Sequence, residues 1–155
     1  MKQFKHFLVV IADGEHARFV VPGKIAGAFR TMASVTSPNA HQRTSDLVSD
    51  GLGRSYESGS PTHHAVAPHN DPHELAKLRF IRSIAERTNV MVTEGKADGV
   101  LLVAPAYALA ELKDKLTTTA AARVVGVVQH DLVKVPDHDL SEHLKEWAQP
   151  AHLDA

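Results

Sequence analysis

The feature that most constrains the fold is a short, unbroken apolar run close to the start of the chain. The six residues Phe7–Ala12 carry no charged or polar side chain, and Asp13-Gly14 ends the run. A signal-peptide core needs roughly 7–15 apolar residues and a membrane-spanning helix about 20, so the run is too short for either. Continuous apolar runs of this length are typical of strands covered on both faces. We therefore expect a buried central strand over residues 4–12 of a cytoplasmic protein without a membrane span.

Turn residues after this run predict two further strands. Asp13-Gly14 favours a hairpin, because such turns need a positive φ and glycine supplies it. β-branched and aromatic residues then continue over His16–Val21, and Pro22-Gly23 closes this second strand. A third strand is expected between residues 27 and 35. The hairpin makes the second strand antiparallel to the first.

A long polar segment follows over residues 36–71, rich in Ser, Thr, Pro, Gly, Asn and His. Loops longer than about 12–15 residues are uncommon in compact domains and are usually functional or disordered. Neither side of this segment makes a convincing core alone. We therefore expect one α/β domain over residues 1–148 with the loop inside it, and a frayed tail over residues 149–155.

The second half of the chain predicts helices that alternate with strands. Asp71, Pro72 and Glu74 form a strong helix start, and Gly95 ends that helix. The remaining elements are a strand over 100–104, a helix over 105–116, a strand over 124–128 and a helix over 136–147. Strands joined by a helix within one sheet run parallel. The expected fold is α/β and ribonuclease-H-like, a mixed five-stranded sheet in the order βββ–loop–αβαβα with helices on its faces.

Composition removes several classes of function. The chain contains no cysteine, which excludes disulfide scaffolds, thiolate zinc sites and cysteine nucleophiles. The formal net charge is -1, which argues against a strongly basic nucleic-acid binder but is compatible with a local basic patch.

Three segments of the chain resemble one bacterial family. They are VIADGEHARFV at Val10–Val20, DGVLLVAPAYALAELK at Asp98–Lys113 and VVQHDLVKVPDHDLSEHL at Val127–Leu144. The family is that of proteins required for attachment to host cells, which are relatives of the archaeo-eukaryotic peptide release factors. The likeness spans most of the chain, from Phe4 to Leu144, and is weakest in the long loop.

The resemblance implies the fold of the release-factor middle domain, whose long loop carries a Gly-Gly-Gln motif that supports hydrolysis of peptidyl-tRNA. Here the corresponding stretch reads GLGRSY over 51–56 and SGS over 58–60, and the chain contains no Gly-Gly-Gln. Release-factor catalysis is therefore not expected. The resemblance instead implies a non-enzymatic binding module that contacts the ribosome, RNA or a protein partner. The expected contact surface is the loop 36–73 with the helix after it, where Arg54, Ser55 and Tyr56 are candidate binding residues.

Histidines in the loop suggest a different function. Neutral imidazole is a common ligand for zinc, copper and nickel. The candidate ligands are four clustered histidines and two strand-end carboxylates: His63, His64, His69, His73, Asp13 and Asp131. They would make the protein a metal-dependent hydrolase or nuclease. The plainer interpretation is a polar loop whose histidines line a binding surface and give adventitious affinity for divalent metals, with no cofactor.

Two more side chains are candidates for binding. Arg18 in the second strand either faces a partner or pairs with an acid such as Glu15 or Asp13. Tyr107, just inside a predicted helix, either lines the carboxyl edge of the sheet or packs against it. Self-association is a third alternative for the function, and it predicts an exposed apolar patch or a broad symmetric interface.

Overall fold

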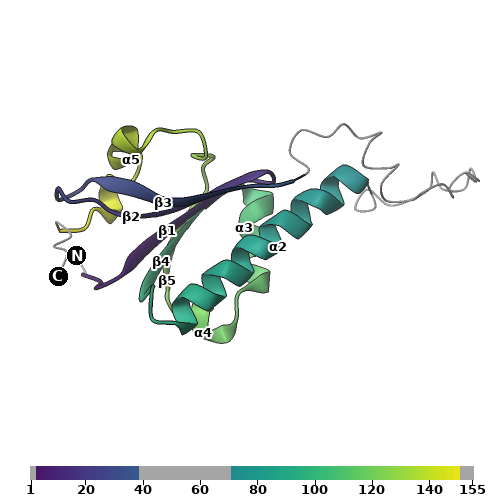
Figure 1. Ribbon diagram of the computed structural model, residues 1–155, viewed down its shortest axis with the longest axis horizontal. Helices are drawn as coiled ribbons and strands as arrows, with labels where there is room; N and C mark the ends of the chain where they lie inside the picture. The colour runs from purple at the N-terminus through teal and green to yellow at the C-terminus, as the bar shows by residue number, and fades with distance from the viewer. Residues whose placement is uncertain (1–2, 39–70, 151–155) are drawn as a thin grey trace, which may run out of the picture.

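The computed structural model describes residues 3–38 and 71–150, and Figure 1 shows a sheet with helices on both faces. The strands are β1 (Phe7–Ala12), β2 (His16–Pro22), β3 (Phe29–Thr36), β4 (Gly99–Val103) and β5 (Val124–Val128). The helices are α2 (Pro72–Thr93), α3 (Ala106–Lys115), α4 (Thr118–Ala121) and α5 (Asp137–His143), with a 3-10 turn η4 (Lys145–Trp147). None of these described helices has the length and apolarity that crossing a membrane requires.

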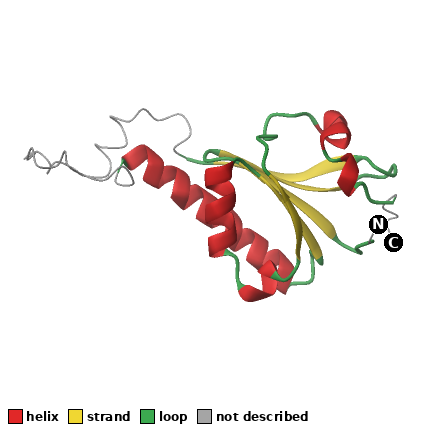
Figure 2. Cartoon of the chain, turned by 180° about the vertical axis from the view of Figure 1, so that it is seen from behind, coloured by secondary structure: helices red, strands yellow, loops and turns green. Residues whose placement is uncertain are grey.

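The five strands lie in the order β3-β2-β1-β4-β5. β2 is antiparallel to both of its neighbours, β1 and β3, whereas β4 is parallel to β1 and β5. The mixed five-stranded α/β sheet predicted from the sequence is therefore confirmed, as is the succession of three strands followed by alternating helices and strands. Helices α2, α3 and α4 lie on one face of the sheet and α5 lies on the other (Figure 2).

The apolar run near the start of the chain forms the middle strand, as predicted. All six residues of β1 are buried. Leu8 and Val10 pack in the core beneath α2, whereas Phe7 and Val9 pack in the core on the α5 face. Successive side chains of a strand point to opposite faces. Because both faces of β1 are covered, no polar side chain is tolerated in the run.

Helix α2 begins where the sequence predicts. The side chain of Asp71 accepts a hydrogen bond of 2.8 Å from the backbone N–H of His73, and Pro72 occupies the first turn. This cap satisfies an N–H group that the helix itself leaves free. Ile81 and Ile84 are fully buried against the sheet. The opposite stripe of α2 remains in contact with solvent.

Some element boundaries differ from the predicted ones. β1 begins at Phe7 rather than at residue 4, because the backbone N–H groups before it donate to the carboxylate of Asp98 and form a turn. The last predicted helix ends at His143, since Leu144 leaves helical geometry with a φ of -119°. Helix α4 was not expected, because its 4 residues are too few to show helical periodicity.

Gly126 in β5 provides space for an aromatic ring. A Cβ atom at this position would overlap the ring of Trp147. We expect Gly126→Ala to displace the ring and to lower the free energy of unfolding by about 1–2 kcal/mol, as overpacking does. The chain contains 1 tryptophan, so fluorescence during chemical denaturation reports both the displacement and the stability.

A double variant is the control for this prediction. In a Trp147→Leu background, Gly126→Ala should lower the free energy of unfolding by less than it does in the natural chain, because the rigid ring is gone. A Gly126→Ala protein with unchanged stability and unchanged tryptophan emission would contradict the contact.

Candidate functional site

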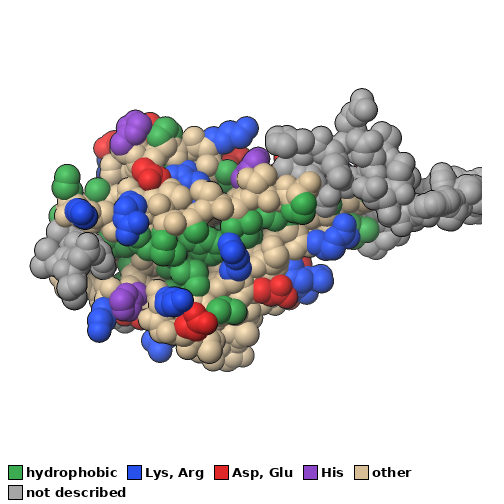
Figure 3. Space-filling view, viewed as in Figure 1, with side chains coloured by type: hydrophobic (Ala, Val, Ile, Leu, Met, Phe, Trp, Pro, Cys, Tyr) green, Lys and Arg blue, Asp and Glu red, His purple; other side chains and the backbone are tan. Residues whose placement is uncertain are grey.

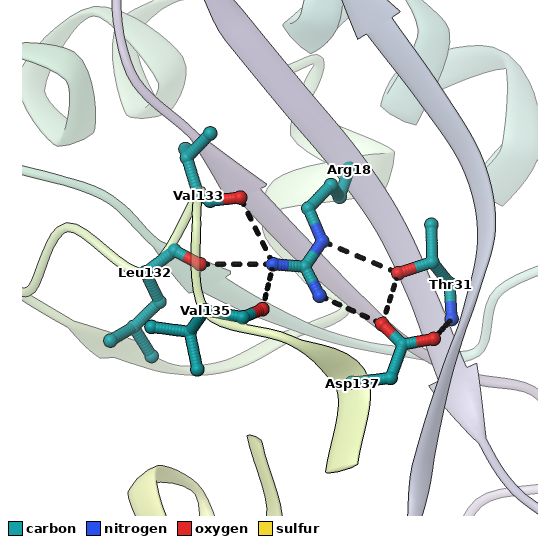
Figure 4. Close-up of polar contacts among 6 residues, drawn as sticks. All are labelled: Arg18, Thr31, Leu132, Val133, Val135 and Asp137. Carbon is teal, nitrogen blue, oxygen red and sulfur yellow. Dashed lines mark hydrogen bonds and ion pairs between the residues drawn. The ribbon is translucent and has the colours of Figure 1, made fainter. Parts of the chain in front are cut away.

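Arg18 in β2 is buried on the α5 face of the sheet (Figure 4). The residue is only 8% exposed. Its Nη1 group donates to three carbonyl oxygens of the loop before α5, those of Leu132 (3.0 Å), Val133 (3.0 Å) and Val135 (2.5 Å). A guanidinium keeps its charge and holds its donors in a fixed fork. These contacts therefore fasten the loop between β5 and α5 to the sheet.

Asp137, the first residue of α5, supplies the counter-charge. Its Oδ1 atom lies 2.8 Å from Nη2 of Arg18, and its Oδ2 atom accepts a 2.8 Å bond from the backbone N–H of Thr31 in β3. Partial burial acts to raise the pKa of Asp137, but the hydrogen bonds from Thr31 and the charge of Arg18 outweigh it and lower this pKa below its usual value. One charged network thus holds β2, β3 and α5 together.

The sequence leaves two roles open for Arg18, facing a partner or pairing with an acid, and the structure shows an ion pair. The partner is Asp137 rather than Glu15 or Asp13, and it lies 119 positions along the chain. The remaining guanidinium nitrogen, Nε, donates to the hydroxyl of Thr31 at 3.3 Å. Every nitrogen of the guanidinium therefore has a partner inside the chain, so Arg18 acts as part of the framework.

Tyr107 lies where the β1–β2 turn meets α2 and α3. Its hydroxyl accepts a hydrogen bond of 3.0 Å from the backbone N–H of Gly14, and the ammonium of Lys77 lies 5.9 Å from the centre of its ring. Burial raises the pKa of the Tyr107 hydroxyl; the negative charges of Asp13 and Asp131 act in the same direction, against the Gly14 bond and Lys77. Tyr107 thus lies at the carboxyl edge of the sheet with 45% of its surface exposed, and its role in binding stays a prediction.

The strand-end carboxylates act as turn residues. Oδ1 of Asp13 accepts two 2.7 Å bonds from the backbone N–H groups of Glu15 and His16. Oδ1 of Asp131 accepts a longer bond of 3.4 Å from Val133. Within residues 3–38 and 71–150, no three His, Cys, Asp or Glu side chains are grouped so that they could hold a metal ion. The described part of the chain therefore gives the hydrolase alternative no ligand set.

His73 is the one histidine of the predicted ligand cluster that the structure describes. It lies in the first turn of α2, and its Nδ1 atom is buried without a hydrogen-bond partner among the described residues. The other loop candidates lie outside the described residues: Arg54, Ser55, Tyr56, His63, His64 and His69. Their roles in binding or metal ligation stay predictions.

A groove that the sequence analysis does not predict runs between β3 and α2. Its volume is about 730 Å³. The sheet contributes Phe19, Met32, Ala33 and Val35. The helix and the turn after it contribute Ser83, Glu86, Arg87, Val90, Met91, Glu94 and Lys96. On this side of the molecule, apolar side chains gather in a band with charged side chains beside it (Figure 3).

The groove exists because α2 packs over the middle of the sheet, against β1, and leaves the β2–β3 edge uncovered. Two large apolar side chains are exposed in it, Met32 at 46% and Val90 at 52%. Met32 lies beside the irregularity where the β2–β3 register shifts. The guanidinium of Arg87 lies 5.9 Å from the centre of the Phe19 ring, so it leans over the groove.

One sequence signal could have found this groove. Val90 stands on the solvent-exposed stripe of α2, between the charged residues Glu86 and Glu94. An apolar residue on an otherwise polar stripe indicates that the stripe meets a partner.

Comparison with known proteins adds a family assignment. The family described as "Protein required for attachment to host cells" matches residues 8–144 of this chain. A search of curated proteins found no match to this chain. One similar solved structure is an archaeal translation termination factor, with 10% identity and a TM-score of 0.48 over 92% of this chain and 39% of that one. Another is an archaeal protein with 9% identity and a TM-score of 0.44, over 92% and 37% of the two chains.

This chain thus spans less than two thirds of the length of both of these archaeal structures. The family match, in contrast, covers all five strands and the helices from α2 to α5 almost completely. It also includes the three segments that carry the sequence resemblance. The chain belongs to the family of proteins required for attachment to host cells.

Proposed function

We propose that this chain is a non-enzymatic binding module, and that it serves attachment by holding a protein partner along the groove between β3 and α2. The loop 36–73 joins these two elements, since β3 ends at Thr36 and α2 begins at Pro72. We include this loop in the proposed contact surface. The other face of the sheet is largely covered by α5 and by the Arg18–Asp137 network, and the hollows on that face are smaller, at about 380 and 190 Å³.

The observation that supports this proposal is the exposure of Met32 and Val90 in one groove. Single exposed apolar residues are ordinary, whereas apolar side chains gathered on one face mark interaction sites. Covering the exposed half of each side chain would stabilise a complex by about 1 kcal/mol apiece. The charged groups at the rim, such as Glu86 and Arg87, would then set the orientation of the partner.

RNA, free or in the ribosome, is a second candidate partner. Between residues 77 and 87, helix α2 carries four basic residues and one acid: Lys77, Arg79, Arg82, Arg87 and Glu86. Phosphate contacts release counterions, so RNA binding weakens steeply with salt, whereas binding in an apolar groove does not. Salt-sensitive co-sedimentation with ribosomes would favour RNA as the partner. A protein that stays in the supernatant at low salt removes this candidate.

The test of the proposed function measures how many cells attach to host cells when the variant is the only version of this protein that they produce. Val90→Glu places a charge in the groove without touching the core, so we expect it to abolish attachment to host cells. Thr93→Glu is the matched control, because Thr93 is exposed on the same helix but does not line the groove. Circular dichroism checks that both variants fold. Attachment by Val90→Glu cells at the natural level would refute the proposal.

A further inference from the structure

The exposed stripe of α2 beside the groove has an ordered charge pattern. Each of its residues lies three or four positions from another member, so all of them share one side of the helix: Arg79, Ser83, Glu86, Arg87, Val90 and Glu94. All six are exposed. The stripe begins with a base, ends with an acid and has an adjacent acid and base at its centre.

This pattern is complementary to itself when reversed. Two copies of the stripe laid antiparallel, with the two-fold axis midway between Glu86 and Arg87, place Arg79 of each copy opposite Glu94 of the other. The same axis places Glu86 opposite Arg87, and Ser83 opposite Val90. A parallel arrangement would instead place each charge opposite its own kind. The sequence order along α2 thus favours one symmetric, antiparallel arrangement, in which equivalent patches meet across a two-fold axis.

We infer that the occupant of the groove is a second copy of this chain, bound through an antiparallel contact of the two α2 stripes. This inference rests on the proposed function, because it names the partner of the same groove. Because the dimer is symmetric, the Arg79–Glu94 pair and the Glu86–Arg87 pair each occur twice. Four ion pairs therefore surround the contact. The contact covers Val90 of each copy, and the exposed Met32 lies in the same groove.

The charges on the stripe are available for such a contact. Glu94 lies 3.1 Å from Lys96 of its own chain, but both side chains are more than half exposed, and such surface pairs are weak. Arg87 leans over Phe19 at the groove without an acid partner among the described residues. Glu86 likewise forms no ion pair within residues 3–38 and 71–150.

The test is sedimentation equilibrium of the purified full chain with a charge-swap series. We expect the natural protein to form a dimer of twice the chain mass. Arg79→Glu and Glu94→Arg should each weaken dimerisation by about tenfold, because each turns two attractions into two repulsions. The double variant, Arg79→Glu with Glu94→Arg, should restore the natural dissociation constant. Lys113→Glu, a reversal at an exposed position on α3, should change nothing.

Three results would overturn this inference. They are a strict monomer at the highest soluble concentration, a dimer that ignores the single reversals, and a double variant that stays as weak as the singles. None of these results would contradict the proposed function. The proposed function is tested independently and is refuted if cells with the Val90→Glu protein attach normally. A monomeric protein whose Val90→Glu variant still loses attachment would mean that the groove holds a different protein.

Discussion

Replacing Arg18 by methionine should destabilise the fold more than any surface substitution, by about 3–5 kcal/mol. Most of this loss comes from acceptors left without a donor, because each buried acceptor that loses its hydrogen bond costs about 1–3 kcal/mol. Here the carboxylate of Asp137 and three carbonyl oxygens of the loop before α5 lose their donor together. Methionine fills a similar volume, so the loss reports the polar network rather than a cavity.

Chemical denaturation of Arg18→Met, followed by circular dichroism, measures this loss. Arg18→Lys is the informative second variant, because lysine keeps the charge but lacks the planar fork with which the guanidinium reaches its five acceptors. We expect the free energy of unfolding of Arg18→Lys to lie between those of the natural protein and Arg18→Met. Arg30→Met is the control, since Arg30 is an exposed arginine on the neighbouring strand β3. If Arg18→Met were as stable as Arg30→Met, Arg18 would not hold the framework.

Replacing Asp137 by asparagine should cost about 2 kcal/mol near neutral pH. The value is smaller than for Arg18 because the Asp137 side chain is 42% exposed, and solvent screens part of the interaction. Asparagine keeps one of the two oxygens that accept bonds from Thr31, but it replaces the other by an NH2 group and removes the counter-charge of a buried guanidinium. Arg18 would then be a buried charge without an acid.

The same substitution should change how stability depends on pH. The pKa of Asp137 in the folded chain lies below its ordinary value of 3.8, so the folded state binds this proton less readily than the unfolded state. Asp137 therefore stabilises the fold above pH 3.8, and this contribution is lost as the pH falls from there through the lowered pKa. The Asp137→Asn protein should accordingly lose less stability on acidification than the natural protein.

Urea denaturation across the acid range measures this difference. Asp139→Asn is the matched control, because Asp139 is an exposed acid on the same helix whose ion-pair partner among the described residues is the exposed His138, at 3.6 Å. We expect the control to follow the natural protein at every pH. Equal acid sensitivity in Asp137→Asn and the natural protein would show that this carboxylate does not stabilise the fold through its charge.

Local sequence patterns predicted the parts of the fold that depend on local physics. The unbroken apolar run Phe7–Ala12 is buried completely only in the middle of an α/β sheet, and β1 is the middle strand. The Asp71-Pro72 start of α2 was predictable for a similar reason, because its cap bonds within three residues. The boundaries that differ depend on distant groups, as where Asp98 binds the chain just before β1.

The site was less predictable than the fold. The pairing of Arg18 with Asp137 joins residues far apart in sequence, and only the packing of α5 on the sheet brings them together. The groove arises because no helix packs over β2 and β3 on the α2 side of the sheet. This arrangement depends on how the helices pack and cannot be predicted from any single residue. Val90 and Met32 become informative only when the fold places both in one groove.

Photo-crosslinking in attaching cells tests the central claim, that the groove between β3 and α2 is the binding surface. A photoreactive amino acid replaces Val90 in one protein and Lys113, exposed on α3, in another. We predict a discrete crosslinked product from position 90 and none from position 113, with twice the chain mass if the occupant is a second copy. Equal crosslinking from both positions, or none from position 90, would contradict the account.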